Sequence, residues 1–397
     1  MQERYNNLII KHQTLFNEKA DKIFSTAGRT ELGGNHTDHN LGKVIAGTIN
    51  LDTIAAVTPT DNSVVSLISE GFPAVTVDVS DLKIRENEKG TTNSLVRGIA
   101  ASFVSRGIKI GGFNANTTTN VLKGSGLSSS AAIEVLCATI FNNLYNNDSF
   151  SPVTLAVIGQ EAENNYFGKP CGLMDQIACG YGGIVHIDFA EQKKPIVTPV
   201  YVNFEDFGYS LVVVNTGGNH ADLTPEYGAI PAEMKSVAAL FGQKVLRKVN
   251  EDEFFDSLKT VRKKIENDRA VLRAIHFFEE NHRVDDMLTA LKNSDFDKYL
   301  SLVQASGNSS AKFLQNVFCS TGIKEQGISL ALAVTEKFLK GRGASRVQGG
   351  GFAGTIQAYI PLGQIEEYCK IMDNIFGQNS AVILKIRPEK TGCFWQR

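Results

Sequence analysis

The sequence contains little cysteine, a single tryptophan and almost no net charge. Its 397 residues include six cysteines, and none of these stands in a CxxC pair, so we expect reduced and mostly buried thiols. Lys and Arg number 40 and Asp and Glu number 42, which leaves a formal charge of −2. A general nucleic-acid binder carries a basic surplus instead, so this class of protein is excluded.

Long apolar runs are also missing. No run approaches the ~20 residues of a membrane-spanning helix, so we expect no membrane partner. The N-terminal segment 1–22 lacks the apolar core of a signal peptide, and we expect a cytoplasmic chain. Hydrophobic residues make up 42% and charged residues 21%, as in ordinary globular proteins, which excludes disordered, coiled-coil and collagen-like classes.

The pattern of apolar residues predicts an α+β fold. Runs rich in Val, Ile and Thr predict consecutive strands in the first half, at Lys43–Thr48, Thr53–Thr58, Ser63–Ile68 and Val75–Val79. Helical spacing predicts helices at Asn93–Arg106, Ser128–Leu144, Phe254–Glu280 and Ser310–Val317. We therefore expect a strand-rich N-terminal domain, 1–205, and a helix-rich C-terminal domain with a small antiparallel sheet, 206–397.

Glycines gather in three clusters, at Gly28–Asp38, Lys123–Ala132 and Gln348–Thr355. In the middle cluster Gly124 and Gly126 allow a sharp turn and a close approach of the backbone to a ligand. Three serines follow and a helix starts, which adds unpaired N–H groups and a partial positive charge. This combination favours a phosphate site over an ordinary helix cap, although the segment is neither a Walker P-loop nor a GxGxxG motif.

The first cluster is dense in side chains that form hydrogen bonds. Such density suits a polyhydroxylated ligand, because each hydroxyl needs a donor and an acceptor. A metal site on His36, Asp38 and His39, or a polar surface turn, are the alternatives. The residues concerned are Arg29, Glu31, Asn35, His36, Thr37, Asp38 and His39.

The three clusters, in this order, resemble the three signature motifs of the GHMP small-molecule kinases. The first is similar to the galactokinase signature of that superfamily, Gly-Arg-x-Asn-Leu-Ile-Gly-Glu-His-Thr-Asp, and reads here Gly-Arg-Thr-Glu-Leu-Gly-Gly-Asn-His-Thr-Asp. A further segment, Ala162–Gln176, resembles the catalytic stretch of the family. The motifs span residues 28 to 355, so the resemblance covers nearly the whole chain. It implies two α+β domains with the active site in the cleft between them.

The resemblance also implies a reaction. The γ-phosphoryl group of ATP would pass to the anomeric hydroxyl of a hexose, and galactose is the expected hexose. Such a step depends mostly on positioning and electrostatics. Asp175 would accept the C1 hydroxyl proton or orient that hydroxyl, and Arg29 would keep Asp175 ionised and offset phosphoryl charge. Ser130 and Glu163 would hold Mg²⁺. The ATP phosphates would bind Lys123, Gly124, Ser125, Gly126, Leu127, Ser128, Ser129 and Ser130.

For the sugar, the resemblance implies that Asp38 bridges two ring hydroxyls and that His36 and Asn35 lie near the exocyclic O6. Tyr227 and the backbone N–H of Gly172 would complete the sugar contacts. Asn35 stands where the family usually has Glu, so a kinase for N-acetylgalactosamine or another hexose is an alternative.

Two further alternatives concern the class of protein. A mevalonate- or homoserine-type kinase fits the phosphate loop but not His36-Thr37-Asp38. A non-catalytic sugar sensor on the same fold is the second, and the presence of the three serines, Arg29 and Asp175 argues against it. Ser94, Leu95 and Arg97 are candidates for adenine contacts, and a monomer fits the sequence.

Overall fold

The computed structural model describes residues 2–122, 124–169, 171–191, 194–218, 223–320 and 322–397. Within them, eight strands form one sheet in the order β12-β1-β2-β5-β3-β4, with β6 paired to β2 and β7 to β6. Neighbours are antiparallel except β3 and β5. The strands are β1 (Lys22–Gly33), β2 (Lys43–Pro59), β3 (Val64–Ser69), β4 (Val75–Asp78), β5 (Phe113–Thr119), β6 (Ile184–Asp188), β7 (Ile196–Val200) and β12 (Gly392–Gln396).

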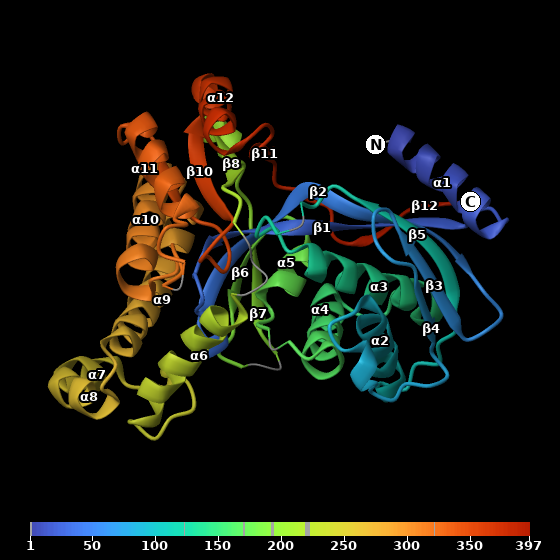
Figure 1. The fold of residues 1–397 in the computed structure, drawn as a ribbon, viewed down its shortest axis with the longest axis horizontal. Coiled ribbons are helices and arrows are strands. Elements are labelled where there is room, and N and C mark those ends of the chain that lie inside the picture. Colours follow the sequence, from blue (N-terminus) through green and yellow to red (C-terminus); the bar gives the residue numbers. More distant parts are fainter. Residues whose placement is uncertain (1, 123, 170, 192–193, 219–222, 321) are drawn as a thin grey trace.

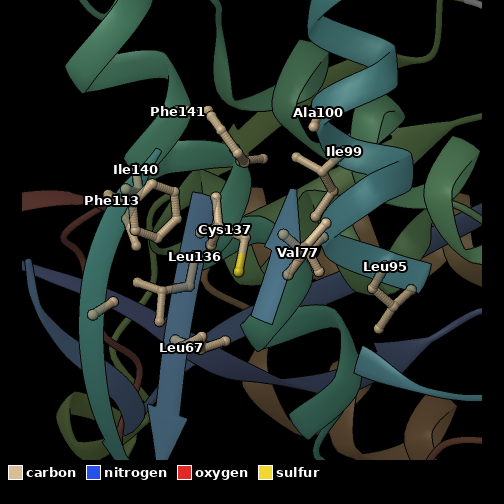
Figure 2. Packing of buried hydrophobic residues seen from close by; sticks show 14 of the residues in the cluster. Leu67, Val77, Leu95, Ile99, Ala100, Phe113, Leu136, Cys137, Ile140 and Phe141 are labelled. Carbon is tan, nitrogen blue, oxygen red and sulfur yellow. The ribbon is translucent and has the colours of Figure 1, made fainter. Parts of the chain in front are cut away.

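Helices cover both faces of this sheet. One face carries α2 (Thr92–Ser105), α3 (Ser129–Asn146), α4 (Pro152–Ala162) and α5 (Met174–Tyr181), and the other carries α1 (Gln2–Phe16) (Figure 1). Successive strand residues point to opposite faces, so Phe24 packs under α3 while its neighbour Ile23 packs against α1. Figure 2 shows the larger core, in which Phe113 from β5 packs against Phe141 from α3, and Ile99 from α2 belongs to the same cluster.

The second unit combines a small sheet with seven helices in the part of the chain that the structure describes. Its four antiparallel strands lie in the order β11-β8-β10-β9: β8 (Tyr209–Asn215), β9 (Ala344–Val347), β10 (Thr355–Pro361) and β11 (Ala381–Leu384). The helices are α6 (Thr224–Ala239), α7 (Glu251–Asp256), α8 (Leu258–Ile265), α9 (Asp268–Lys292), α10 (Phe296–Ser309), α11 (Gly327–Leu339) and α12 (Ile365–Phe376).

The two units share a continuous apolar core. Leu32 at the end of β1 packs in one cluster with Val284 and Met287 of α9. The last strand also crosses back, since β12 pairs with β1 in the first sheet. As a result α5 and the start of α3 lie near the middle of the molecule, next to the place where the units meet (Figure 1).

The architecture agrees with the expected α+β class, and β3 and β4 fall close to the ranges predicted at Ser63–Ile68 and Val75–Val79. The two strands predicted at Lys43–Thr48 and Thr53–Thr58 are wrong, because β2 is a single strand. Its first half pairs with β6 and its second half with β5, while the N–H of Asn50 donates to the carbonyl of Lys385. The polar break in the sequence is therefore bridged by partners far along the chain.

Two predicted helices also differ. The helix expected at Phe254–Glu280 is divided, because α8 ends at Ile265 and Glu266 takes a φ of 52°. The side chain of Asn267 then accepts a hydrogen bond from the N–H of Ala270 and starts α9. The helix expected at Ser310–Val317 is one π-type turn, Ser310–Leu314, that ends at Gln315 with a φ of 58°.

The chain passes from the first sheet to the second between Val200 and Tyr209, and we retain the boundary near residue 205 as a proposal. Within the described ranges, no helix combines the length and the apolar character that crossing a membrane requires.

Candidate active site

The Gly/Ser loop bends into a cradle at the N-terminus of α3. Gly124, Gly126 and Ser128 have φ values of 71°, 66° and 60°, and such left-handed residues turn the backbone sharply. Leu127 is fully buried and anchors the loop. The Ser125 hydroxyl is also buried and donates to the carbonyl of Leu122 at 2.6 Å. Lys123 lies outside the described residues.

The remaining serines stand where a ligand can reach them. Ser128 and Ser129 are half-buried and Ser130 is exposed, all at the first turn of α3. The unpaired N–H groups of an 18-residue helix begin here, beside three hydroxyls. This geometry suits an anion, and the phosphate site stays a prediction.

Arg29 joins this loop to the predicted catalytic aspartate. Its Nε and Nη2 donate to Oδ1 and Oδ2 of Asp175 at 2.8 and 3.0 Å, which is a bidentate ion pair. Its Nη1 donates to the carbonyl of Gly126, and its backbone N–H donates to the carbonyl of Leu127 at 3.1 Å. The guanidinium is therefore fixed between β1, the loop and α5.

Asp175 lies at the first turn of α5 with its side chain 36% exposed, whereas the Arg29 side chain is 6% exposed. Removal of water raises the pKa of Asp175, but Arg29 and the Ser128 hydroxyl, which donates to Oδ2, outweigh this and leave the pKa below its usual value. Asp175 is thus ionised at neutral pH, and its carboxylate faces the mouth of the cradle.

The predicted sugar residue Asp38 meets a second predicted residue, Gly172. A Cβ added to Gly172 would overlap the Asp38 carboxylate, so only glycine fits at this position. Asp38 accepts a hydrogen bond from the N–H of His39 at 2.9 Å. Gly172 precedes Asp175 by three residues, so this contact brings the sugar motif to the catalytic stretch.

The third glycine cluster lies beneath the other sugar residues. His36 Nε2 bonds to the carbonyl of Gly350 at 2.9 Å, and burial lowers the pKa of His36 to about 3, so the ring is neutral. The Tyr227 hydroxyl donates to the carbonyl of Gly351 at 3.0 Å, and burial raises the pKa of Tyr227 to about 12. A Cβ on Gly350 would lie 2.6 Å from the Tyr227 ring.

Glu163 is buried and contacts the exposed Lys169 and the buried Gln176, the neighbour of Asp175 in the chain. Lys169 Nζ lies 3.4 Å from its Oε1, and Gln176 Nε2 donates to its Oε2 at 3.1 Å. The same Gln176 nitrogen donates to Glu134 at 3.0 Å. Burial and the nearby charge of Glu163 raise the pKa of Glu134 well above its usual value.

Sequence reasoning missed Glu134, Gln176 and Lys169, and it gave Ser128 no role toward Asp175. Two signals were available. Glu134 follows Ser130 by four residues, which places both on one face of α3. Gln176 is adjacent to Asp175 on α5.

The proposed magnesium ligands have suitable chemistry. Ser130 and Glu163 offer hard oxygen donors, and the Glu163 oxygens keep lone pairs beyond those used by Lys169 and Gln176. No cluster of three or more His, Cys, Asp or Glu suited to a metal is found in the described part of the chain. Mg²⁺ takes few ligands from protein and completes its shell with phosphate and water, so this donor set fits it.

The candidates for adenine contacts are enclosed by protein. Ser94, Leu95 and Arg97 are 2%, 6% and 1% exposed. The Arg97 guanidinium donates to Glu88 at 2.8 Å and to the carbonyls of Asp78 and Asp81. It therefore binds the preceding loop to α2.

Comparison with known proteins agrees with this geometry. The galactokinase galactose-binding signature matches residues 10–59, and the GHMP kinases N terminal domain matches residues 93–183. The galactokinase of Lacticaseibacillus paracasei is 30% identical over 368 residues, which cover 91% of this chain and 90% of that protein. The chain belongs to the galactokinase family. The galactokinase of Actinobacillus pleuropneumoniae is 29% identical and covers 91% of each chain.

Solved structures show the same fold. The Lactococcus lactis galactokinase complexed with galactose has a TM-score of 0.84 at 23% identity and covers 98% of this chain and 99% of its own. The Methanococcus jannaschii mevalonate kinase has a TM-score of 0.65 at 15% identity, covering 92% and 98%. The predicted superfamily and the two-domain GHMP kinase fold are confirmed, and membership of this family makes the protein an ATP-using kinase.

Proposed function

We propose that this galactokinase-family kinase transfers the γ-phosphoryl group of ATP to the anomeric hydroxyl of galactose. The observation that carries the proposal is the bidentate Arg29–Asp175 pair, which the Ser128 hydroxyl and the Gly126 carbonyl fix at the mouth of the anion cradle. The contact of Asp38, the proposed sugar-binding side chain, with Gly172 near Asp175 supports the proposal.

In the proposed reaction the C1 oxygen attacks the γ-phosphorus, and the bond from phosphorus to the β–γ bridging oxygen breaks. The C1 hydroxyl proton passes to a carboxylate oxygen of Asp175. Because the pKa of Asp175 is low, the carboxylate is a weak base, and it accepts this proton only late in the transfer. Its main task is to orient the hydroxyl, which suits a loose phosphoryl transition state.

Arg29 and the cradle stabilise the negative charges of the Asp175 carboxylate and of the ATP phosphates. The guanidinium keeps Asp175 ionised and faces the transferring phosphoryl group, while the N–H groups at the start of α3 and the serine hydroxyls hold phosphate oxygens. Ser130 and Glu163 would hold Mg²⁺, which when bound neutralises phosphate charge. Asp38, His36, Tyr227 and Gly172 are the proposed sugar contacts.

Asp175→Asn tests the proposal. The amide preserves shape but removes the charge and the base, so we expect kcat to fall by about 10³-fold or more while calorimetry still detects galactose binding. The exposed Asp61→Asn is a matched control and should retain full activity. An Asp175→Asn variant with near-native kcat would remove Asp175 from the reaction.

The sugar is tested separately. A coupled ADP assay with ATP, Mg²⁺ and a panel of hexoses should show galactose as the best substrate. Turnover of N-acetylgalactosamine or another hexose with galactose inert would select the alternative substrate. Binding of both ATP and galactose without any product would select the sensor.

A further inference from the structure

Three positions of the first motif depart from the galactokinase signature, at Glu31, Gly33 and Asn35, and the first and last of these are related. The signature has Asn where this chain has Glu31, and Glu where it has Asn35. The carboxyl and the amide are thus exchanged between two positions four residues apart. In the structure these two side chains touch, since Asn35 Nδ2 donates to Glu31 Oε1 at 2.9 Å.

The Asn35 amide has no hydrogen-bonding capacity left for a ligand. Its second Nδ2 hydrogen goes to the carbonyl of Gly349 at 2.8 Å. Its Oδ1 accepts from Asn316 Nδ2 at 2.8 Å and from the Ser310 hydroxyl at 3.2 Å. A side-chain amide offers two donors and two acceptor lone pairs, so all four are used. The residue is also 0% exposed.

The exchanged carboxylate lies inside the protein. Glu31 is 2% exposed and pairs with Arg346 on β9, which is 0% exposed. A buried carboxylate needs such a partner, because water cannot solvate it. Position 31 has this partner, and position 35 faces backbone carbonyls and the polar groups of Asn316 and Ser310.

We infer that Glu31 and Asn35 form a reciprocally exchanged pair, in which residue 35 positions the Gly349–Gly350 loop behind the sugar instead of contacting the sugar. Asn35 binds the Gly349 carbonyl, and the next carbonyl, of Gly350, binds His36. This step rests on the proposed function: it puts a neutral amide, and not a carboxylate, at the position that the resemblance expects near O6. The enzyme should therefore tolerate a hexose without the C6 hydroxyl.

The first test is thermal and needs no activity. At pH 8, above the pKa of about 7 that burial gives Glu31, Asn35→Glu places a second carboxylate against Glu31, and Glu31→Asn leaves Arg346 buried without its partner, so each should lower Tm by about 5 °C or more. The double variant restores the order of the signature and removes the like-charge contact. We expect its loss of Tm to be at most half the sum of the two single losses.

The control is the double variant Glu31→Asn/Asn7→Glu. Asn7 is an exposed residue of α1, on the other face of the first sheet, so the two losses of Tm should add. Additive losses in the Glu31→Asn/Asn35→Glu variant as well would overturn the inference.

The second test uses the wild-type enzyme, so it stands even if a variant fails to fold. Deleting a hydroxyl held by a carboxylate costs about tenfold to 150-fold, and deleting one held by a neutral group costs about 2- to 12-fold. With ATP and Mg²⁺, we expect kcat/KM for 6-deoxygalactose to lie within about tenfold of that for galactose. A larger loss would show a charged contact at C6 and overturn the inference.

The two failures are distinguishable. If neither sugar is phosphorylated, the proposed function fails, and the thermal cycle alone decides whether the pair is exchanged.

Discussion

The two ends of the candidate site treat charge in opposite ways. At the cradle, the Asp175 carboxylate is 36% exposed and keeps lone pairs beyond those used by Arg29 and Ser128. Beneath the sugar motif, the ion pair of Glu31 with Arg346 is at most 2% exposed, and the Asn35 amide is saturated. Both ends are dense in polar side chains, yet the atoms left unpaired at the second end, such as Arg346 Nε and Asn316 Oδ1, are buried, whereas the Asp175 carboxylate is partly exposed.

A high density of polar side chains therefore does not identify a ligand site; unpaired hydrogen-bonding atoms at an accessible surface do. We call the end around Asp175 the open end and the end around Glu31 and Asn35 the closed end. The closed end ties the two units together. Glu280 on α9 shows this, since its Oε1 accepts from the backbone N–H of Gly34 at 3.1 Å and from Ser306 at 2.6 Å. The comparison predicts that variants at the open end change turnover, and that variants at the closed end change stability.

The largest effect on turnover in this comparison should come from Arg29→Lys. Lysine keeps the positive charge but cannot donate to both Asp175 oxygens and the Gly126 carbonyl together. We expect kcat to fall by about 10²–10³-fold with little change in the KM for the sugar. Steady-state kinetics would show this, with the exposed Arg85→Lys as a control that stays near wild type. A fall in Tm with kcat preserved would show that Arg29 stabilises the fold and does not act in turnover.

The next effect should come from Gly172→Ala. The added Cβ overlaps the Asp38 carboxylate, so Asp38 must move from its place beside the catalytic stretch. We expect the KM for galactose to rise by about tenfold or more, since a charged hydrogen bond is lost. Gly228→Ala on α6 is the matched control, because its Cβ meets nothing within 4 Å and alanine favours a helix. An unchanged KM for Gly172→Ala would separate Asp38 from the sugar.

The open end could largely be predicted from the sequence, and the closed end could not. The cradle depends on a contiguous segment, and its turn residues and helix start are local features. The saturation of Asn35 depends on Ser310, Asn316 and Gly349, which lie about 300 residues further along the chain. A local pattern cannot show whether such distant partners use up a side chain.

The same distinction explains the errors in the fold. Residues 43–59 contain a polar interruption that looks like a turn, but distant partners pair with both halves of β2. The break between α8 and α9 was a local feature, because Asn267 is a favourable helix start; the charged amphipathic pattern on both sides concealed it.

A smaller effect, on stability alone, should follow from Glu31→Gln. Burial raises the pKa of Glu31 to about 7, against the pull of Arg346 and Arg29. The folded state then retains a proton between about pH 4.5 and 7 that the unfolded state releases, so this group lowers the free energy of unfolding as the pH rises through that window. The variant should lack this decline, which over about 2.5 pKa units is on the order of 3 kcal/mol.

Denaturant titrations of wild type and Glu31→Gln at several pH values between 4.5 and 8 would measure that difference. The exposed Glu325→Gln should leave the pH profile of the wild type unchanged. Parallel profiles for wild type and Glu31→Gln would mean that Arg346 keeps Glu31 ionised throughout.

The smallest effect should come from Glu134→Gln. Its Oε1 is buried without a hydrogen-bond partner in the described structure, and burial raises the pKa of Glu134 well above its usual value. The folded state therefore keeps a proton that the unfolded state releases above about pH 4.5, which lowers the free energy of unfolding as the pH rises from there. Glutamine keeps an acceptor for Gln176 and has no proton to release, so Tm should stay within about 2 °C of wild type at pH 4.5 and exceed it at pH 8. Differential scanning calorimetry at the two pH values measures both, and a Tm below that of wild type at pH 8 would show that Glu134 is needed as an anion beside Glu163.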